Sequence, residues 1–174
     1  MTSIARFPPS RRVGNLAGFL ACAGLLGFGY YLQYAQGIQP CPLCIMQRVA
    51  FLAAGLGFLV AAVHDPASFG ARIYATLIAV SALSGMTIAV RHVWLQHTPA
   101  DQRPACGPGL EYLFDNFGPF DALRKVLRGS GECGAVDWTL LGFSIPELAL
   151  VAFVGLTAWA IFFGFRRQAR GGTP

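Results

Sequence analysis

Four apolar blocks, each close to 20 residues long, constrain this chain more than any other feature. They lie at approximately 15–34, 44–63, 71–90 and 145–165. About 20 apolar residues in a helix cross the hydrocarbon core of a bilayer. The blocks are apolar on every face, whereas the strands of a membrane β-barrel alternate apolar and polar residues. The sequence therefore predicts an all-α integral membrane protein built as a four-helix bundle.

The composition agrees with a membrane protein and argues against a nucleic-acid-binding protein. Hydrophobic residues make up 55% of the 174 residues and charged residues only 12%, against about 25% charged residues in an ordinary soluble domain. The net charge of +5 comes from basic residues at the ends of the apolar blocks and in the loops, without a dense basic patch. We expect one membrane domain over 1–174.

Arginines near both ends of the chain predict its orientation in the membrane. Six of them lie in the two tails: Arg6, Arg11, Arg12, Arg166, Arg167 and Arg170. Basic residues accumulate on the cytoplasmic side, and an even number of spans places both tails on one side. We therefore expect cytoplasmic termini in a bacterial inner membrane, with periplasmic loops at 35–43 and 91–144. A cleaved signal peptide is disfavoured, because the first block is too long and no clear cleavage site follows it.

The long outer loop contains an amphipathic segment. Apolar residues recur at helical spacing on both sides of Pro119: Leu110, Leu113, Phe114, Phe117, Phe120, Leu123 and Leu127. Beyond the proline, the opposite face is charged: Asp121, Arg124, Lys125 and Arg128. The pattern predicts a short helix that either lies on the membrane surface or caps the bundle.

Cys41 and Cys44 form a Cys-x-x-Cys motif where the first outer loop enters the second apolar block. Proline is favoured at the first position of a helix, so Pro42 should begin the helix, with Cys41 at the N-cap and Cys44 in the first turn. Unpaired N–H groups and the helix dipole stabilise a thiolate there. Ile45 follows the motif where attachment of a c-type haem requires histidine, which excludes that site. The motif indicates a redox-active pair.

Cys106 and Cys133 lie in the long loop on the same side of the membrane. Disulfides form readily in an oxidising compartment, so this pair is either a second redox pair or a structural staple that closes the loop. A four-cysteine zinc site is disfavoured, because these two cysteines are 27 positions apart and structural zinc usually takes closely spaced pairs. We expect no metal, and we expect Cys22 to be an inert thiol within the first span.

Four polar residues are candidates for a ligand site beside the first pair. Arg48 follows Cys44 by one helical turn, so its guanidinium could stabilise the Cys44 thiolate and donate to a carbonyl oxygen of a ligand from the lipid. The alternative is an arginine that reaches out to the interface. Gln47 could serve the same ligand or bond a neighbouring helix. His92 and Gln96, one turn apart at the outer end of the third block, could line the same pocket or be solvated.

These motifs, taken in order, resemble the DsbB family of disulfide bond formation proteins over nearly the whole chain. The matching residues are Cys41-Pro42-Leu43-Cys44, Gln47-Arg48, His92, Gln96, Cys106, Cys133, Trp138, Leu141, Gly142 and Pro146. The short Cys-x-x-Cys motif is common in proteins, whereas the ordered set is specific to this family.

The resemblance implies a monomeric quinone-dependent oxidoreductase that reoxidises a periplasmic thioredoxin-like thiol oxidase of the DsbA type. Cys106 would form the mixed disulfide with that partner, and Cys133 would be its intramolecular mate. Cys41 and Cys44 would then receive the electrons, and Cys44 would pass them to ubiquinone or menaquinone with help from Arg48. The other class of function is a non-enzymatic membrane scaffold with structural disulfides. A vitamin-K-epoxide-reductase-like enzyme is a nearer alternative than the scaffold, but that family arranges its spans and loop cysteines differently.

The tail arginines generate a first prediction, about topology. Reporter domains fused after Gly70 and after Gly171 should be cytoplasmic, and those fused after Gln36 or Gly129 should be periplasmic. Alkaline phosphatase and fluorescent-protein fusions measure this directly. A periplasmic carboxy terminus would contradict both the number of spans and the compartment assigned to the cysteines.

Overall fold

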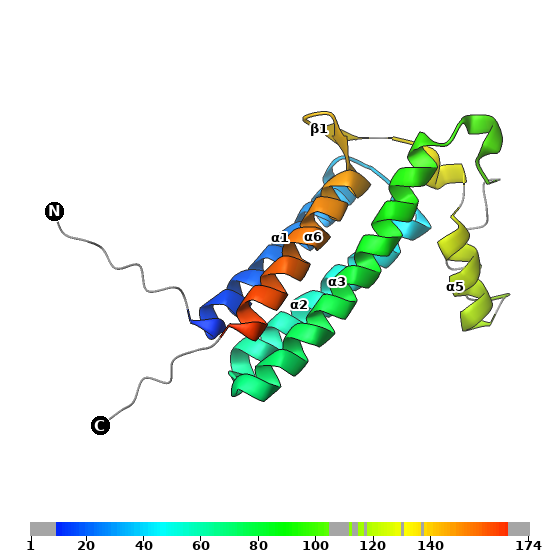
Figure 1. The fold of residues 1–174 in the computed structure, drawn as a ribbon. Helices are drawn as coiled ribbons and strands as arrows, with labels where there is room; N and C mark the ends of the chain where they lie inside the picture. Colours follow the sequence, from blue (N-terminus) through cyan, green and yellow to red (C-terminus); the bar gives the residue numbers. More distant parts are fainter. Residues whose placement is uncertain are drawn as a thin grey trace, which may run out of the picture.

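The structure is a computed structural model that describes residues 10–104, 112, 115–116, 118–129, 131–136 and 138–166. Four long helices form a bundle (Figure 1): α1 (Arg11–Ala35), α2 (Pro42–His64), α3 (Ser68–His97) and α6 (Ile145–Phe165). Each is long and apolar enough to cross a membrane. The chain is therefore a multi-pass membrane protein, and the predicted all-α four-helix fold is confirmed.

The remaining elements are short and lie between α3 and α6. They are η1 (Ala100–Gln102), α5 (Pro119–Arg128), η2 (Gly131–Gly134), and the two strands β1 (Thr139–Leu140) and β2 (Phe143–Ser144). The strands pair antiparallel as a small hairpin, with Thr139 opposite Ser144. Figure 1 shows the hairpin and α5 at the end of the bundle where α2 begins and α3 ends.

The helices pack through small residues and a few large aromatic rings. α2 lies between α1 and α3, and α6 packs mainly against α3. Phe51 of α2 stacks on Phe153 of α6 with ring centroids 4.0 Å apart, and alanines such as Ala54 and Ala82 are fully buried around them. Small residues let helices approach closely inside a bilayer, where dispersion forces replace the hydrophobic effect between helices. Many large apolar residues face outward, as expected for a surface in contact with lipid.

The two ends of the described chain meet at the end of the bundle opposite the hairpin. The Arg11 guanidinium donates to the backbone carbonyl of Arg166, and Trp159 Nε1 donates to the carbonyl of Gly14 at 2.9 Å. The start of α1 and the end of α6 therefore lie on one side, as an even number of spans requires. That this side is the cytoplasm is still a prediction.

The helix α3 extends beyond the limit predicted from the sequence. The third apolar block was expected to end near Val90, but the helix continues for seven more residues to His97. The apolar block ends where polar side chains begin, whereas the helix backbone continues until the turn at Thr98. The extension places His92 and Gln96 on a rigid helix instead of in the predicted loop.

The helix predicted after Pro119 is confirmed, but it buries a different face from the predicted stripe. Ala122 and Val126 of α5 pack with Leu43, Leu95 and Cys133. The side chains of the predicted apolar stripe are exposed: Phe120, Leu123 and Leu127. The earlier part of the stripe, at Leu110, Leu113, Phe114 and Phe117, lies outside the described residues. One face of α5 thus covers the end of the bundle, while Phe120, Leu123 and Leu127 remain exposed.

The packing around Gly85 generates a second prediction, about stability. A Cβ atom at Gly85 would lie 2.3 Å from Phe153 Cζ and 2.8 Å from Ala50 Cβ, both in the core. Gly85→Ala should destabilise the bundle by about 1–3 kcal/mol through overpacking, measured as a lower thermal unfolding midpoint in detergent. The control is Gly155→Ala, because a Cβ there meets no atom of the described chain within 4 Å and alanine favours the helix. Equal midpoints for the two variants would contradict this packing.

Candidate functional site

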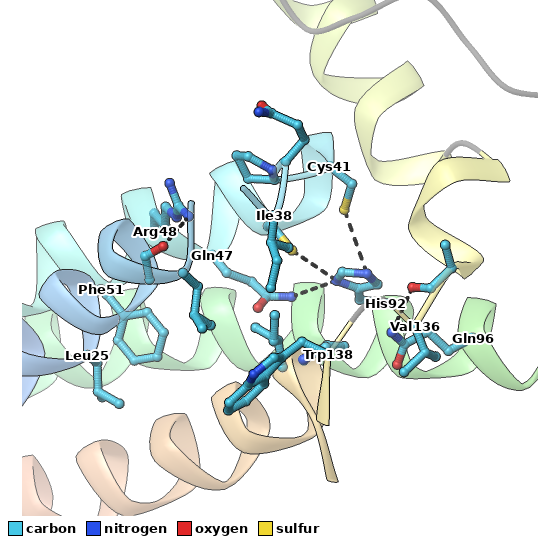
Figure 2. Close-up of a pocket in the computed structure, with 18 of the residues that line it drawn as sticks. Leu25, Ile38, Cys41, Gln47, Arg48, Phe51, His92, Gln96, Val136 and Trp138 are labelled. Atoms are coloured by element: carbon cyan, nitrogen blue, oxygen red, sulfur yellow. Dashed lines mark hydrogen bonds between the residues drawn. The ribbon is translucent and has the colours of Figure 1, made fainter. Parts of the chain in front are cut away.

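An apolar pocket of about 380 Å³ lies between α1, the start of α2, the end of α3 and the segment that leads into α6. Its walls are mainly apolar side chains: Leu25, Leu26, Leu32, Phe51, Trp138 and Pro146. Polar residues also line it: Cys41, Cys44, Gln47, Arg48, His92 and Gln96. Figure 2 shows these side chains around the cavity. The pocket is at the end of the bundle that carries the hairpin and α5.

The start of α2 presents both cysteines of the Cys-x-x-Cys motif to this pocket. Cys41 is the N-cap of α2 and Pro42 is its first residue, as predicted. Both cysteines are thiols, and both are partly exposed. The first backbone N–H groups of a helix have no partner within the helix, so this position favours negative charge on either sulfur.

His92 of α3 contacts both thiols at once. Its Nε2 lies 3.7 Å from Cys41 Sγ, and its Nδ1 lies 3.9 Å from Cys44 Sγ. Gln47 Nε2 lies 3.3 Å from the same Nδ1, and the dashed lines that converge on His92 in Figure 2 mark these contacts. With Gln47 donating to Nδ1, the neutral ring carries its proton on Nε2 and donates to Cys41. The imidazole is 3% exposed, so it is a buried part of the site and not a solvated residue of the interface.

Cys133 joins this group from the loop. It lies in η2 with none of its surface exposed and packs with Leu43, Leu95 and the α5 helix. A side-chain nitrogen of His92 and the Sγ atoms of Cys41 and Cys133 all lie within 4.8 Å of one another. The structure therefore brings the second cysteine of the loop to the first cysteine of the motif. The predicted mate Cys106 lies outside the described residues.

The same three donors could hold a soft metal ion while both thiols are reduced. Structural zinc sites use four protein ligands. Here Cys44 faces the other ring nitrogen of His92, which a metal bound at Nε2 cannot share. The described donors therefore form a three-ligand set. Two sulfurs at this separation also suit thiol–disulfide exchange, in which the thiolate of one cysteine attacks the other when that one is part of a disulfide and releases its former mate.

Arg48 is held against α1 and lines the pocket. One guanidinium nitrogen donates to Gln33 Oε1, and Nη2 donates to the carbonyl of Gly29 at 2.9 Å. The cation also lies over the ring of Tyr30, 4.9 Å from its centroid. A guanidinium has five N–H donors, so these contacts leave donors that a ligand could use. The side chain reaches a neighbouring helix instead of the interface.

Gln96 lines the pocket and ties three segments together. Its Nε2 donates to the carbonyl of Ala135 at 3.4 Å, and its Oε1 accepts from Ser144 Oγ at 2.8 Å. Ser144 is the N-cap of α6 and forms a capping box with Glu147. Gln96 thus connects the end of α3 to the loop behind Cys133 and to the start of α6.

Several pocket residues were not singled out from the sequence. Trp138 forms one wall and makes an edge contact with Phe28, with ring centroids 5.6 Å apart. In the sequence, Trp138 stands out only as part of the family resemblance, and Phe51 gives no signal because it is one of many aromatic residues in apolar spans. Cys22 is buried in the core against Gly55, as expected for a thiol with a packing role.

The fold and the site define a class: a multi-pass membrane protein with a thiol pair at the mouth of an apolar pocket and a third cysteine within reach. The family model for disulfide bond formation protein DsbB matches residues 11–163. The chain belongs to this family, whose name describes a role in generating disulfides.

Curated relatives of the same name align with this chain along nearly their whole length. Disulfide bond formation protein B of Hahella chejuensis is 54% identical over 153 residues, covering 87% of this chain and 92% of the relative. The protein of the same name from Methylococcus capsulatus is 51% identical, covering 88% and 93%. That from Xanthomonas euvesicatoria is 49% identical over 160 residues, covering 91% and 93%.

Proposed function

We propose that this chain is a quinone-dependent thiol oxidoreductase of the bacterial inner membrane. It reoxidises a periplasmic thioredoxin-like thiol oxidase of the DsbA type and passes the electrons to ubiquinone or menaquinone. The observation that carries the proposal is the contact group of Cys41, His92 and Cys133 beside a pocket that Cys44 lines. A loop cysteine, the Cys-x-x-Cys pair and an apolar cavity would thereby form one continuous route for electrons.

The sulfur exchanges in this route balance at every step. A thiolate of the partner attacks Cys106 of the loop disulfide and releases Cys133 as a thiolate. Cys133 attacks Cys41 of the Cys41–Cys44 disulfide and releases Cys44. The second thiol of the partner then displaces Cys106, so the partner leaves oxidised. Cys106 attacks Cys133, which restores the loop disulfide and leaves Cys41 and Cys44 reduced by two electrons.

The pocket suits a quinone on three counts. Its volume of about 380 Å³ and its apolar walls match a flat ring with an apolar tail. Gln47 and Arg48, which carry N–H donors, line the same cavity and could donate to the carbonyl oxygens of a ring. Cys44 also lines this cavity. A bound quinone would supply the oxidant that takes two electrons and two protons from the Cys41 and Cys44 thiols.

His92 and Arg48 would have different roles in this scheme. His92 holds both thiols of the motif and can accept or return a proton at its ring nitrogens as the sulfurs change state. Arg48 presents a fixed cation to the pocket, held in place by its bonds to α1. Neither residue would exchange electrons. Both would keep Cys44 and a quinone ring in a reactive arrangement.

The scaffold alternative accounts for a loop disulfide but not for the rest of the site. A disulfide that only staples the loop needs no second thiol pair and no pocket. It also needs no buried histidine in contact with Cys41 and Cys44. The discriminating assay mixes the purified protein with a reduced DsbA-type partner and either quinone, and follows quinone absorbance and partner thiols together. An oxidoreductase consumes two thiols for each quinone over many turnovers, whereas a scaffold consumes none.

A third prediction concerns Arg48. Arg48→Lys keeps the positive charge but loses the planar guanidinium with its fixed N–H donors. The apparent KM for quinone should therefore rise about tenfold or more while the protein still folds. Steady-state kinetics at varied quinone concentration measure this. The control is Arg72→Lys, since Arg72 lies near the opposite end of the bundle over the Phe165 ring. Unchanged quinone kinetics in Arg48→Lys would show that Arg48 only packs against α1.

A fourth prediction separates the roles of the cysteines. Cys133→Ser should increase the trapped mixed disulfide between Cys106 and the partner, because its competing intramolecular mate is gone. Cys44→Ser should abolish turnover with quinone but still oxidise the partner once. Non-reducing gels and turnover assays measure both, with Cys22→Ala as the control that keeps full activity. Sustained turnover of Cys44→Ser with quinone, or of Cys106→Ser with the partner, would contradict the relay.

A further inference from the structure

Arg103 lies in the loop just before the first loop cysteine and caps the end of α3. Its Nε donates to the carbonyl of Thr98 at 2.8 Å, and its Nη2 donates to the carbonyl of Gln96 at 3.2 Å. The last carbonyls of a helix lack partners within the helix, and a cation is favoured at this end of the helix dipole. These contacts fix the half-buried guanidinium in one place.

The backbone of the Cys133 turn rests directly on this side chain. A Cβ atom at Gly134 would lie 2.6 Å from Arg103 Cδ and 2.8 Å from its Nε. These distances are shorter than real contacts of a Cβ atom, so a side chain at this position would require Arg103 to shift. Gly134 immediately follows Cys133. Ala135 follows Gly134, and its carbonyl accepts from Gln96 Nε2 at 3.4 Å.

We propose that Arg103 is a positioning residue that holds η2 against the end of α3 and thereby keeps the Cys133 thiol beside Cys41. This inference rests on the proposed relay and adds a residue outside its sulfur chemistry. Forming the Cys41–Cys133 bond requires the two sulfurs to close from within 4.8 Å to about 2.05 Å. The fraction of time that the turn stays docked therefore sets the effective concentration of one thiol at the other.

The test measures that effective concentration without quinone or partner. In the full chain carrying Cys44→Ser and Cys106→Ser, Cys41 and Cys133 are left to pair with each other, and Cys22 is buried in the core. The protein is equilibrated in glutathione redox buffers, and the Cys41–Cys133 disulfide is quantified by peptide mapping. Adding Arg103→Met should lower the effective concentration about tenfold, as expected for losing hydrogen bonds from a charged group. Arg72→Met, near the opposite end of the bundle, should leave it unchanged.

A double-mutant cycle identifies the contact that transmits the effect. Gly134→Ala should lower the effective concentration by displacing Arg103, and in the presence of Arg103→Ala it should cost little more. Thermal unfolding of each variant checks that the bundle is intact, and Arg103→Lys, which keeps the cation but loses the fork, should give an intermediate value. An unchanged effective concentration in folded Arg103→Met, or fully additive losses in the cycle, would overturn the proposal.

The test of Arg103 and the test of the proposed function can fail independently of each other. If the parent protein failed to reduce quinone, the relay to quinone would be contradicted, but the redox titration of Cys41 and Cys133 would still decide the role of Arg103. Conversely, in Arg103→Met the reoxidation of the reduced Cys41–Cys44 pair by quinone should slow much less than the Cys41–Cys133 exchange, because Arg103 contacts α3 and η2 and does not itself line the pocket. A fall in the reoxidation rate as large as the fall in the exchange would overturn the assignment of Arg103 to the loop exchange.

Discussion

The buried imidazole of His92 connects the helix bundle to the chemistry at its end. It contacts two thiols and one amide of α2 from its place on α3. A polar ring with 3% of its surface exposed must find hydrogen-bond partners, because an unsatisfied polar group inside an apolar bundle costs several kcal/mol. The contacts that satisfy His92 also hold Cys41 and Cys44 at fixed positions. The close packing of α2 on α3 through small residues makes this arrangement possible.

The two cysteines of the motif share the pocket but differ in their other neighbours. Cys41, at the N-cap of α2, lines the pocket and also lies within reach of Cys133, while Cys44, in the first turn, lines the pocket with Arg48. In the proposed relay, the spacing of the Cys-x-x-Cys motif would separate a sulfur that exchanges with Cys133 from one that meets a lipid-soluble oxidant. One helical turn would serve both roles, because the two residues lie at the start of a single rigid helix.

The sequence predicted those parts of the molecule that depend on local pattern. The four spans follow from apolar length, and the N-cap position of Cys41 follows from Pro42. The pocket could not be predicted in this way, because its walls come from four segments that are distant in the chain. The extension of α3 to His97 was missed, since hydropathy falls where the polar residues begin although the helix continues. The contact of Arg103 with Gly134 has no local signature, because an isolated glycine and an isolated arginine in a loop have many possible roles.

The proposed relay depends most on direct sulfur exchange between Cys133 in the loop and Cys41 at the start of α2. Oxidised wild-type protein can be mixed with one equivalent of reduced DsbA-type partner, quenched in acid at millisecond intervals and mapped for disulfides by mass spectrometry. The relay predicts that the amount of Cys41–Cys133 disulfide rises and then falls. The Cys41 and Cys44 thiols should accumulate after it and then be reoxidised by quinone. Complete reduction of quinone with no Cys41–Cys133 disulfide at any time would contradict it.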